Sequence, residues 1–373
     1  MTSLFVKIKG QLGNFNLNFE HDFKSEGITV LYGPNGSGKS SIISAIGGFF
    51  RNLEISIILN GQDLEGKQKI PSYKRAIGTM FQDPQLFEHL TVSQNLDFAV
   101  KRVKPQNKKY INIEKTDLIK SLDLETLLKR FPINLSGGEK LRVALARTIL
   151  SQPDYLLLDE PMSDLDIRYK AKLIRFLKAF NKQNKIPILY VTHSIEEISQ
   201  IADEIVLINK GRYIVSGFTS KILNSYDFQN LVGKFEASSV LEGFVSKINK
   251  RFSLTTLNID GQDLMVPGSP GSLNNFVRVR IRSRDIIITP IKINSYVAEN
   301  LLVGKILEIE IEKKTAFSEL VIVLLNKKNE NKGQILRARI TTYNLEKMNL
   351  SDNKKIYIYI RSVSIDRQAY QHN

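Results

Sequence analysis

Apolar and polar residues alternate in the first part of the chain. Between Leu4 and Phe23 apolar side chains recur at every second position, as at Val6, Ile8 and Leu17. A period of two residues is typical of half-buried antiparallel strands. We therefore predict two antiparallel strands at the start of the chain.

Short, uninterrupted apolar runs follow further along. Runs of this kind, separated by helical stretches, are typical of strands buried on both faces of a parallel sheet. The segment Thr91–Ser151 lies between them and has a mainly helical pattern. We therefore predict an α/β core with a helical insertion. The four runs are Ile28–Tyr32, Tyr155–Leu158, Pro187–Thr192 and Glu204–Asn209.

The pattern changes again in the last third of the chain. After Gly217 the helical pattern fades, and from Ala237 onward short β-rich stretches alternate with Asn-, Gly- and Lys-rich turns. This predicts a small all-β, OB-like domain over residues 236–373, after a first domain over residues 1–233. The stretches are Phe276–Ile281, Ile306–Ile311, Leu320–Leu325 and Lys355–Ile360.

Two of these stretches resemble each other. Val277–Ile286 ends in Ile-Arg-Ser-Arg-Asp-Ile, and Tyr357–Ile365 ends in Ile-Arg-Ser-Val-Ser-Ile. A duplicated small barrel would produce this similarity, and so would coincidence between two Ile-rich strands. Both readings stay open at this point.

Composition narrows the class of protein. The chain of 373 residues has no cysteine, which excludes disulfides and thiolate metal sites. Its formal charge of +15 is compatible with nucleic-acid binding, with a position near anionic lipid, or with lysines spread over solvated faces. Because no basic run contains interleaved aromatic residues, we favour solvated lysines and expect no nucleic-acid partner.

No window reaches the roughly 20 apolar residues that span a bilayer, and the N-terminus has no apolar core of a signal peptide. We therefore expect a protein that stays in the cytoplasm unless a partner holds it at a membrane.

A glycine-rich loop predicts phosphate binding. The segment Gly33–Ser40 matches the pattern G-x-x-x-x-G-K-[ST] and lies between a predicted buried strand and a helix. Its backbone N–H groups can surround a β-phosphate, Lys39 can reach the β- and γ-phosphates, and Ser40 can bind Mg²⁺. The predicted nucleotide-binding residues here are Gly33, Pro34, Asn35, Gly36, Ser37, Gly38, Lys39, Ser40 and Ser41.

Two carboxylates follow the strand at Tyr155–Leu158. Adjacent residues at a strand end face different ways, so Asp159 and Glu160 can have different roles. We expect Asp159 to bind Mg²⁺ and Glu160 to polarise the attacking water.

A second phosphate-binding helix start is predicted at Leu135–Glu139. Ser136, Gly137 and Gly138 form a turn that leaves backbone N–H groups open to an anion. Two further polar residues are candidates: His193, which follows the predicted strand Pro187–Thr192, and Gln82, in Phe81-Gln82-Asp83-Pro84. His193 can contact a γ-phosphate, and Gln82 can contact Mg²⁺ and water, although each is also common in a purely structural role.

Together these motifs resemble the nucleotide-binding domain of ABC transporters, over about residues 4–217. The motifs follow one another in the order that is usual in this family: the glycine-rich loop, Gln82, the Leu-Ser-Gly-Gly-Glu turn, Asp159–Glu160, Ser163–Asp166 and His193. The resemblance implies that Glu160 is the catalytic base, that His193 is the switch histidine and that Gln82 couples the site to a transport partner. It also implies a head-to-tail homodimer, in which Ser136 and Gly138 contact ATP held by a second copy.

Two departures from the family pattern are visible. The chain has Lys140-Leu141-Arg142 where Lys-Gln-Arg is usual, and Ser163-Asp164-Leu165-Asp166 where Ser-Ala-Leu-Asp is usual. We expect both at the edge of the dimer interface. Phe15 is the candidate for stacking on adenine, with a strand-core role as the alternative.

The last domain resembles the Mop/TOBE-type module of molybdate importer ATPases, over about residues 292–366. The similar stretches are Asn294-Ser295, Ala298–Gly304, Ala338–Ile340 and Arg361–Ile365. Where that module often has Ser-Ala-Arg-Asn, this chain has Val297-Ala298-Glu299-Asn300. A carboxylate in place of a cation weakens oxyanion binding, so we expect a structural or dimer-contact role for this motif.

The resemblance implies the ATP- and Mg²⁺-dependent subunit of an importer, at the cytoplasmic face of the membrane. Its partners would be integral membrane permease subunits and, indirectly, an extracytoplasmic substrate-binding protein. Molybdate, or a related oxyanion such as tungstate, is the first candidate substrate. Sulfate, polyamine, ferric iron and sugar importers remain alternatives, as does a soluble ABC ATPase without a transport role.

Overall fold

The computed structural model describes residues 4–50, 53–103, 114–232, 238–268, 272–293, 298–312, 315–326 and 333–361. The chain divides into two compact units, Met1–Phe218 and Thr219–Asn373. Among the described residues no helix is both long and apolar enough to cross a membrane.

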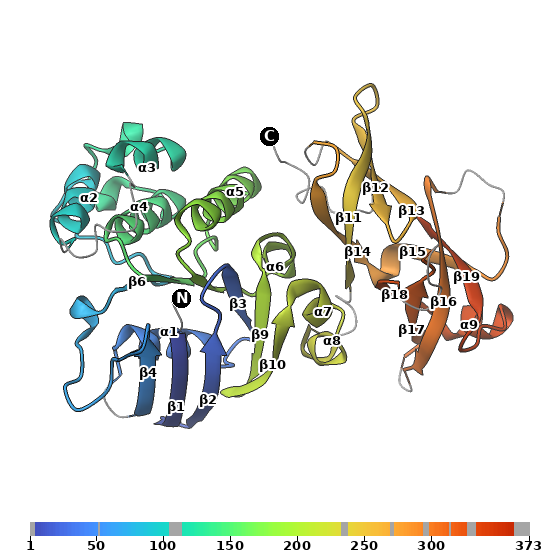
Figure 1. The fold of residues 1–373 in the computed structure, drawn as a ribbon, viewed down its shortest axis with the longest axis horizontal. Helices are drawn as coiled ribbons and strands as arrows, with labels where there is room; N and C mark the ends of the chain where they lie inside the picture. The colour runs from blue at the N-terminus through green and yellow to red at the C-terminus, as the bar shows by residue number, and fades with distance from the viewer. Residues whose placement is uncertain are drawn as a thin grey trace. The chain divides into compact units, whose positions relative to one another are not determined.

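A ten-stranded sheet organises the first unit, and half of it is parallel (Figure 1). Strand β3 (Ile28–Tyr32) lies between β8 (Ile188–Val191) and β9 (Glu204–Asn209), and pairs in parallel with both. Strand β7 (Tyr155–Asp159) continues the parallel part, and β6 (Ile77–Met80) ends it. Strands β3, β7 and β8 are buried over their whole length. Burial on both faces requires apolar side chains at successive positions, which explains their uninterrupted apolar runs. The predicted α/β core is confirmed.

The other half of this sheet is antiparallel. Strand β1 (Leu4–Leu12) pairs with β2 (Phe15–Phe23) in the alternating register that the sequence predicts. Strand β1 also pairs with β4 (Glu54–Leu59), which is followed by β5 (Gln62–Asp63). Strand β10 (Arg212–Phe218) joins the two halves between β2 and β9. Inward side chains of these strands pack with helix α1 (Lys39–Gly47) in one apolar core.

Helices occupy the predicted insertion and the later crossovers. The insertion contains α2 (Val92–Lys101), α3 (Lys115–Ser121) and α4 (Gly137–Leu150), with single 3-10 turns at Glu125–Leu127 and Pro132–Asn134. Side chains cap the helices that begin after loops: Thr91 caps α2 and Ser136 caps α4, each in a capping box. Two more helices, α5 (Ile167–Asn184) and α6 (Ile195–Ile201), connect the parallel strands.

The second unit begins with helices that the sequence pattern did not indicate. Helices α7 (Thr219–Leu223) and α8 (Tyr226–Val232) follow Phe218, where we expected the helical pattern to fade. They are held by polar contacts to the first strand of this unit. Gln229 donates hydrogen bonds to the carbonyls of Leu223 and Ser238, and Asn224 exchanges two with the backbone of Val240.

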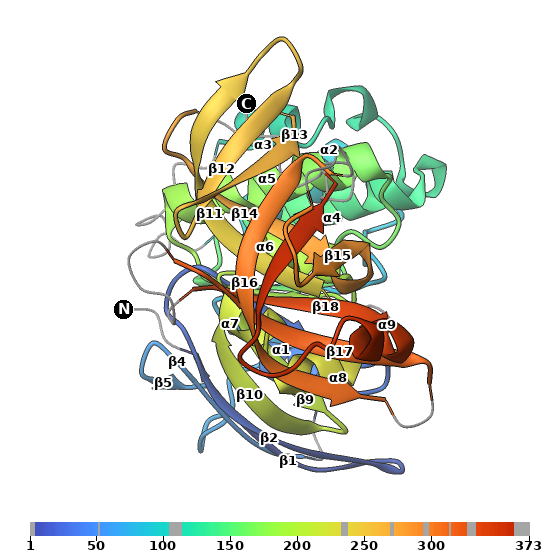
Figure 2. The same cartoon turned by 90° about the vertical axis from the view of Figure 1, so that its right-hand side faces the viewer.

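The remainder of this unit is β-rich, as expected, and contains two antiparallel sheets (Figure 2). The first has the order β13-β12-β11-β14, and the second the order β15-β19-β16-β17-β18. One apolar core lies between them. The strands are β11 (Ser238–Asn249), β12 (Leu254–Ile259), β13 (Gln262–Pro267), β14 (Phe276–Arg282), β15 (Ile286–Thr289), β16 (Asn300–Ile311), β17 (Phe317–Leu324), β18 (Ile335–Thr341) and β19 (Lys355–Ile360), with a 3-10 turn at Ser283–Asp285 and helix α9 (Thr342–Lys347).

The two sheets repeat one four-strand module. When the four strands of each module are numbered along the chain, their order across the sheet is third, second, first, fourth. The first strand of each has a register shift at the same offset from a glycine, after Val245 near Gly243 and after Ile306 near Gly304. The similar sequences noted above belong to the fourth strands, β14 and β19. These agreements favour duplication over coincidence, although residues 362–365 of the second copy lie outside the described residues.

Candidate functional site

The glycine-rich loop connects β3 to α1, as the pattern predicts. Gly36 and Gly38 have φ values of 75° and 101°, which side chains rarely tolerate. At Gly33 a Cβ atom would lie 2.3 Å from the carbonyl oxygen of Ile208, so only glycine lets the loop pack against β9. The Lys39 ammonium donates to the carbonyl oxygens of Gly33, at 2.8 Å, and Pro34, at 3.1 Å. The loop is thus folded around a nearly buried cation.

Asp159 ends strand β7 beside the start of α1. Its side chain accepts a hydrogen bond from Ser40 and is only 2% exposed. Burial raises the pKa of this carboxyl, while Ser40 and Lys39 oppose the rise. Its Oδ1 atom is buried without a hydrogen-bond partner among the described residues. A hydroxyl beside an unsatisfied carboxylate oxygen is a donor set suited to Mg²⁺.

Across the described residues no cluster of three or more His, Cys, Asp or Glu side chains could hold a metal by itself. Mg²⁺ binding at Ser40 and Asp159 stays a prediction.

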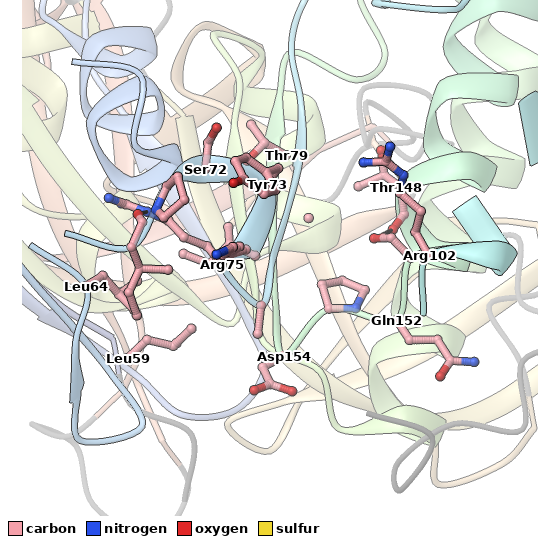
Figure 3. Close-up of a pocket in the computed structure, with 18 of the residues that line it drawn as sticks. Leu59, Leu64, Ser72, Tyr73, Arg75, Thr79, Arg102, Thr148, Gln152 and Asp154 are labelled. Atoms are coloured by element: carbon pink, nitrogen blue, oxygen red, sulfur yellow. Dashed lines mark hydrogen bonds between the residues drawn. The ribbon is translucent and has the colours of Figure 1, made fainter. Parts of the chain in front are cut away.

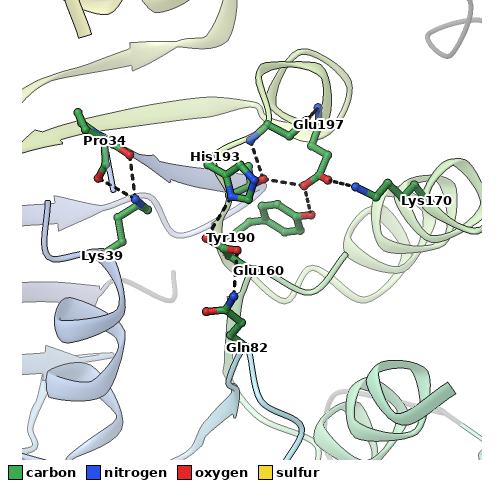
Figure 4. A network of polar contacts seen from close by, with 11 residues as sticks. Pro34, Lys39, Gln82, Glu160, Lys170, Tyr190, His193 and Glu197 are labelled. Carbon is green, nitrogen blue, oxygen red and sulfur yellow. Dashed lines mark hydrogen bonds and ion pairs between the residues drawn. The ribbon is translucent and has the colours of Figure 1, made fainter. Parts of the chain in front are cut away.

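Glu160 lies between two polar side chains from distant parts of the sequence (Figure 4). Its carboxylate is 3.4 Å from Nε2 of Gln82 and 3.2 Å from Nδ1 of His193. Its backbone φ is 47°, a left-handed value that is costly for a residue with a side chain. Gln82 follows β6, Glu160 follows β7 and His193 follows β8. Because these strands are parallel neighbours, their carboxyl ends bring the three residues together.

The second predicted anion site lies at the start of α4. Ser136 Oγ accepts from the Glu139 N–H, and Glu139 accepts from the Ser136 N–H at 2.7 Å. Backbone hydrogen bonding is the first cause of the lowered pKa of Glu139. A cavity of about 350 Å³ opens at this turn. It contains no residue of the glycine-rich loop; it is lined by Ser136, Gly137, Gly138, Glu139, Arg142, Asp164, Leu165, Asp166 and Tyr169.

The two sequence departures lie near this turn. In the first, Leu141 is only 1% exposed while Arg142 lines the cavity, and a place at the edge of a dimer interface stays a prediction. Asp164 is exposed, and its Oδ2 atom lies 3.3 Å from the position of a Cβ on Gly137. The second departure therefore adds a carboxylate beside the Ser136–Gly138 turn.

Phe15 lies against the glycine-rich loop. Its ring carbons are 3.0 and 3.1 Å from the position of a Cβ on Gly38, and its partly buried side chain also packs on the apolar core. Its ring is thus close enough to the loop for the predicted stacking role, and it also has the contacts of a core residue.

A polar brace that the sequence did not reveal joins the Gln82 loop to α4. Asn95 is fully buried, and its side chain bonds the backbone of Phe87, Leu90 and Thr91. Arg147 of α4 donates to the Gln85 carbonyl and, at 3.4 Å, to Asn95 Oδ1. If the loop moved, these buried polar groups would lose their hydrogen bonds, at a cost of about 1–3 kcal/mol for each unsatisfied group. The Asn95 side chain therefore holds the loop in place.

Beside this brace a large open pocket follows the outer edge of β6 (Figure 3). Its volume is about 850 Å³. Leu59 and Leu64 line one wall, and Thr148 and Gln152 line the opposite one. Phe98, Arg102 and Arg147 add an aromatic ring and two cations, and Tyr73 at its rim is 73% exposed.

Two described residues of the motif in the second unit make contacts within the fold. Asn300 is 1% exposed and bonds the backbone of Met265, which ties β16 to β13. The Arg339 guanidinium forms an ion pair with the Glu312 carboxylate, with 3.2 Å between nitrogen and oxygen. Asn294, Ser295, Val297 and the segment 362–365 lie outside the described residues.

Comparisons with known proteins identify the family. Residues 16–163 match the family model described as ABC transporter. The molybdenum import ATP-binding protein ModC of Haemophilus influenzae is 36% identical over 365 residues, which cover 97% of this chain and 99% of that protein. The protein of the same name from Aliivibrio fischeri is 35% identical, covering 97% of this chain and 98% of its own length.

Among solved structures, a dimeric ATP-binding cassette in a post-hydrolysis state, bound to ADP and Pi, has a TM-score of 0.49 and 23% identity. The match covers 59% of this chain and 99% of that one. Through its full-length relatives, the chain belongs to the family of molybdenum import ATP-binding proteins within the ABC transporters.

Proposed function

We propose that this chain is the ATP-hydrolysing subunit of a molybdate importer. The observation that carries the proposal is the carboxylate of Glu160, held between Gln82 and His193 at the carboxyl ends of three parallel strands. The glycine-rich loop with Lys39 follows the neighbouring strand β3. Full-length similarity to proteins named for molybdenum import supports the substrate.

ATP would bind with its phosphates over the glycine-rich loop. Lys39 would then exchange its two carbonyl contacts for phosphate oxygens, and the N–H groups at the start of α1 would face the β-phosphate. Ser40 and Asp159 would hold Mg²⁺, which neutralises charge on the phosphates, and Gln82 would face it from β6. Phe15 would contact the adenine.

Hydrolysis would use Glu160 as the base. The carboxylate accepts a proton from water as the water oxygen attacks the γ-phosphorus, and the bond to the β–γ bridging oxygen breaks to give ADP and phosphate. His193 would contact the γ-phosphate from the other side of Glu160. Its side chain is 62% exposed and so is open to a ligand.

The active form would contain two copies of the chain. The cavity at Ser136, Gly137 and Gly138 includes no residue of the glycine-rich loop, so the two phosphate-binding helix starts do not share a cavity in one copy. A head-to-tail homodimer would bring the turn of one copy onto the ATP of the other. The same ATP would then stabilise the pair by mass action.

Asp164 is expected to oppose this pairing. In the dimer its carboxylate would lie near a γ-phosphate, and two like charges about 4 Å apart repel by roughly 1 kcal/mol in water. Asp164→Asn should therefore lower the ATP concentration at half-maximal dimerisation by roughly 3- to 10-fold. The effect should shrink as salt is added, because salt screens exposed charges. Analytical ultracentrifugation measures it, with the exposed Asp117→Asn as the matched control; weaker pairing of Asp164→Asn would contradict the expectation.

The large pocket at the β6 edge would receive the membrane permease. It is open, it contains aromatic and cationic side chains, and it borders the brace that holds the Gln82 loop. An element seated there would touch Arg147 directly and thereby act on Gln82. The subunit would then lie at the cytoplasmic face of the membrane, and an extracytoplasmic binding protein would deliver substrate to the permease.

Tyr73→Ala should separate assembly from catalysis. Removing an exposed aromatic side chain from the pocket rim costs contact area but leaves the Glu160 site unchanged. We expect ATPase activity of the isolated subunit to stay within about twofold of the unchanged chain, and co-purification with the permease to fall. Tyr213→Ala, another exposed tyrosine outside the pocket, is the control. Equal permease recovery for both variants would argue against this docking site.

Substrate identity can be tested in proteoliposomes that contain the subunit, its permease and its binding protein. Molybdate should stimulate ATP hydrolysis at lower concentration than sulfate, and tungstate should compete with it. If sulfate, a polyamine, ferric iron or a sugar stimulates hydrolysis and molybdate does not, then molybdate is not the substrate. The assignment as an ATPase would still hold.

A further inference from the structure

A buried carboxylate lies beneath the loop that carries His193. Glu197 of α6 is 6% exposed. Its Oε2 atom accepts hydrogen bonds from the Tyr190 hydroxyl at 2.9 Å and from the Thr192 hydroxyl at 2.7 Å. Its Oε1 atom is 3.3 Å from the Lys170 ammonium. Figure 4 shows Tyr190 of β8 and Lys170 of α5 pointing toward Glu197.

The residues on both sides of His193 are tied to this carboxylate or its backbone. Thr192 Oγ1 donates to Glu197 and also accepts from the Ser194 N–H at 3.0 Å. Ser194 Oγ in turn accepts from the Glu197 N–H at 3.3 Å and caps α6. The backbone at His193 is therefore held from both ends.

This fixation matters because His193 is not held by packing. Its imidazole is 62% exposed, and its one described polar contact is with Glu160 at 3.2 Å. An exposed side chain keeps its position only as well as its backbone does. Burial raises the pKa of the Tyr190 hydroxyl, with Glu197 adding to the rise, so this group remains a donor.

Lys170 extends the network toward the loop that follows Glu160. Lys170 lies in the first turn of α5, whose N-cap is Asp166. Asp166 in turn lines the cavity at the Ser136–Gly138 turn. The contacts of Glu197 thus reach from the loop carrying His193 to the helix that begins at the proposed dimer face.

We propose that Glu197 is a positioning residue for hydrolysis, which holds the loop 192–194 so that His193 stays beside Glu160. This inference rests on the proposed function. Glu197 does not touch ATP itself; it acts through Thr192 and Ser194. A misplacement of about 1 Å at a reacting group can lower a rate by roughly 100-fold.

The test is a double-mutant cycle of Glu197→Gln with His193→Ala, in the full-length chain. Glutamine keeps the size of the side chain but loses the charge opposite Lys170 and one acceptor. We expect Glu197→Gln alone to lower kcat by roughly 10- to 100-fold with the KM for ATP changed less than about threefold. In the His193→Ala background the same change should lower kcat by less than about twofold, because there is no imidazole left to position.

If Glu197→Gln lowers kcat by the same factor with and without His193, the proposal is overturned, because a purely structural role predicts equal factors. An unchanged kcat in Glu197→Gln alone would overturn it as well. The exposed Glu125→Gln is the charge-matched control and should leave kcat unchanged. Tyr190→Phe, which removes one donor and no charge, repeats the cycle if Glu197→Gln does not fold. If His193→Ala alone leaves turnover unchanged, the role of His193 in the proposed function fails, and that outcome is distinct from equal factors in the cycle.

Discussion

Lys39→Ala is expected to weaken ATP binding by roughly 100-fold or more. Each hydrogen bond to a charged group is worth about 1.5–3 kcal/mol, and Lys39 already makes two bonds inside the loop that phosphates would replace. The substitution also leaves Asp159 and Glu160 beside the triphosphate without the ammonium that faces them. Like charges would then add to the loss.

Isothermal titration with ATP and Mg²⁺ measures this effect. Lys120→Ala, an exposed lysine of α3, is the matched control and should bind as the unchanged chain does. Full affinity in Lys39→Ala would remove the glycine-rich loop from the account.

Glu160→Gln is expected to lower ATP turnover by about 10²- to 10⁴-fold while ATP still binds. Glutamine keeps the shape of the side chain between Gln82 and His193, but an amide does not accept a proton from water at neutral pH. Phosphate release in a steady-state assay gives the rate, and a binding titration on the same sample shows whether the site is intact. Turnover near that of the unchanged chain would take Glu160 out of its proposed role.

Those parts of the fold that depend on local pattern were predictable. The apolar runs at Ile28–Tyr32 and Tyr155–Leu158 became fully buried parallel strands because burial on both faces demands uninterrupted apolar sequence. The glycine-rich loop was predictable because its glycines and its flanking elements are contiguous in the chain. Parallel pairing then explains why Gln82, Glu160 and His193, each at a strand end, meet.

Features assembled from distant segments were not predictable. Strand β6 has four residues and only two buried positions, too short for its period to stand out. Helices α7 and α8 are held by amide contacts to β11, which no local pattern reports. The Asn95–Arg147 brace spans 52 residues of sequence and depends on where the Gln82 loop passes α2 and α4.

Glu197 left a partial signal in the sequence. Ser194 and Glu197 have the spacing of a capping box, which predicts the start of α6. The Ser194 hydroxyl caps as this pattern predicts, but the carboxylate turns inward to Tyr190, Thr192 and Lys170 rather than back to Ser194. Only the packing of α6 on β8 and α5 reveals its burial.

The most direct measurement of the account is the mass of the Glu160→Gln chain in solution, by light scattering, with and without ATP and Mg²⁺. One copy has a mass of 42.4 kDa. If ATP is held between the glycine-rich loop of one copy and the Ser136–Gly138 turn of another, the nucleotide should roughly double this mass, and ADP should not. A chain that binds ATP at full occupancy and still stays at the mass of one copy would contradict the account.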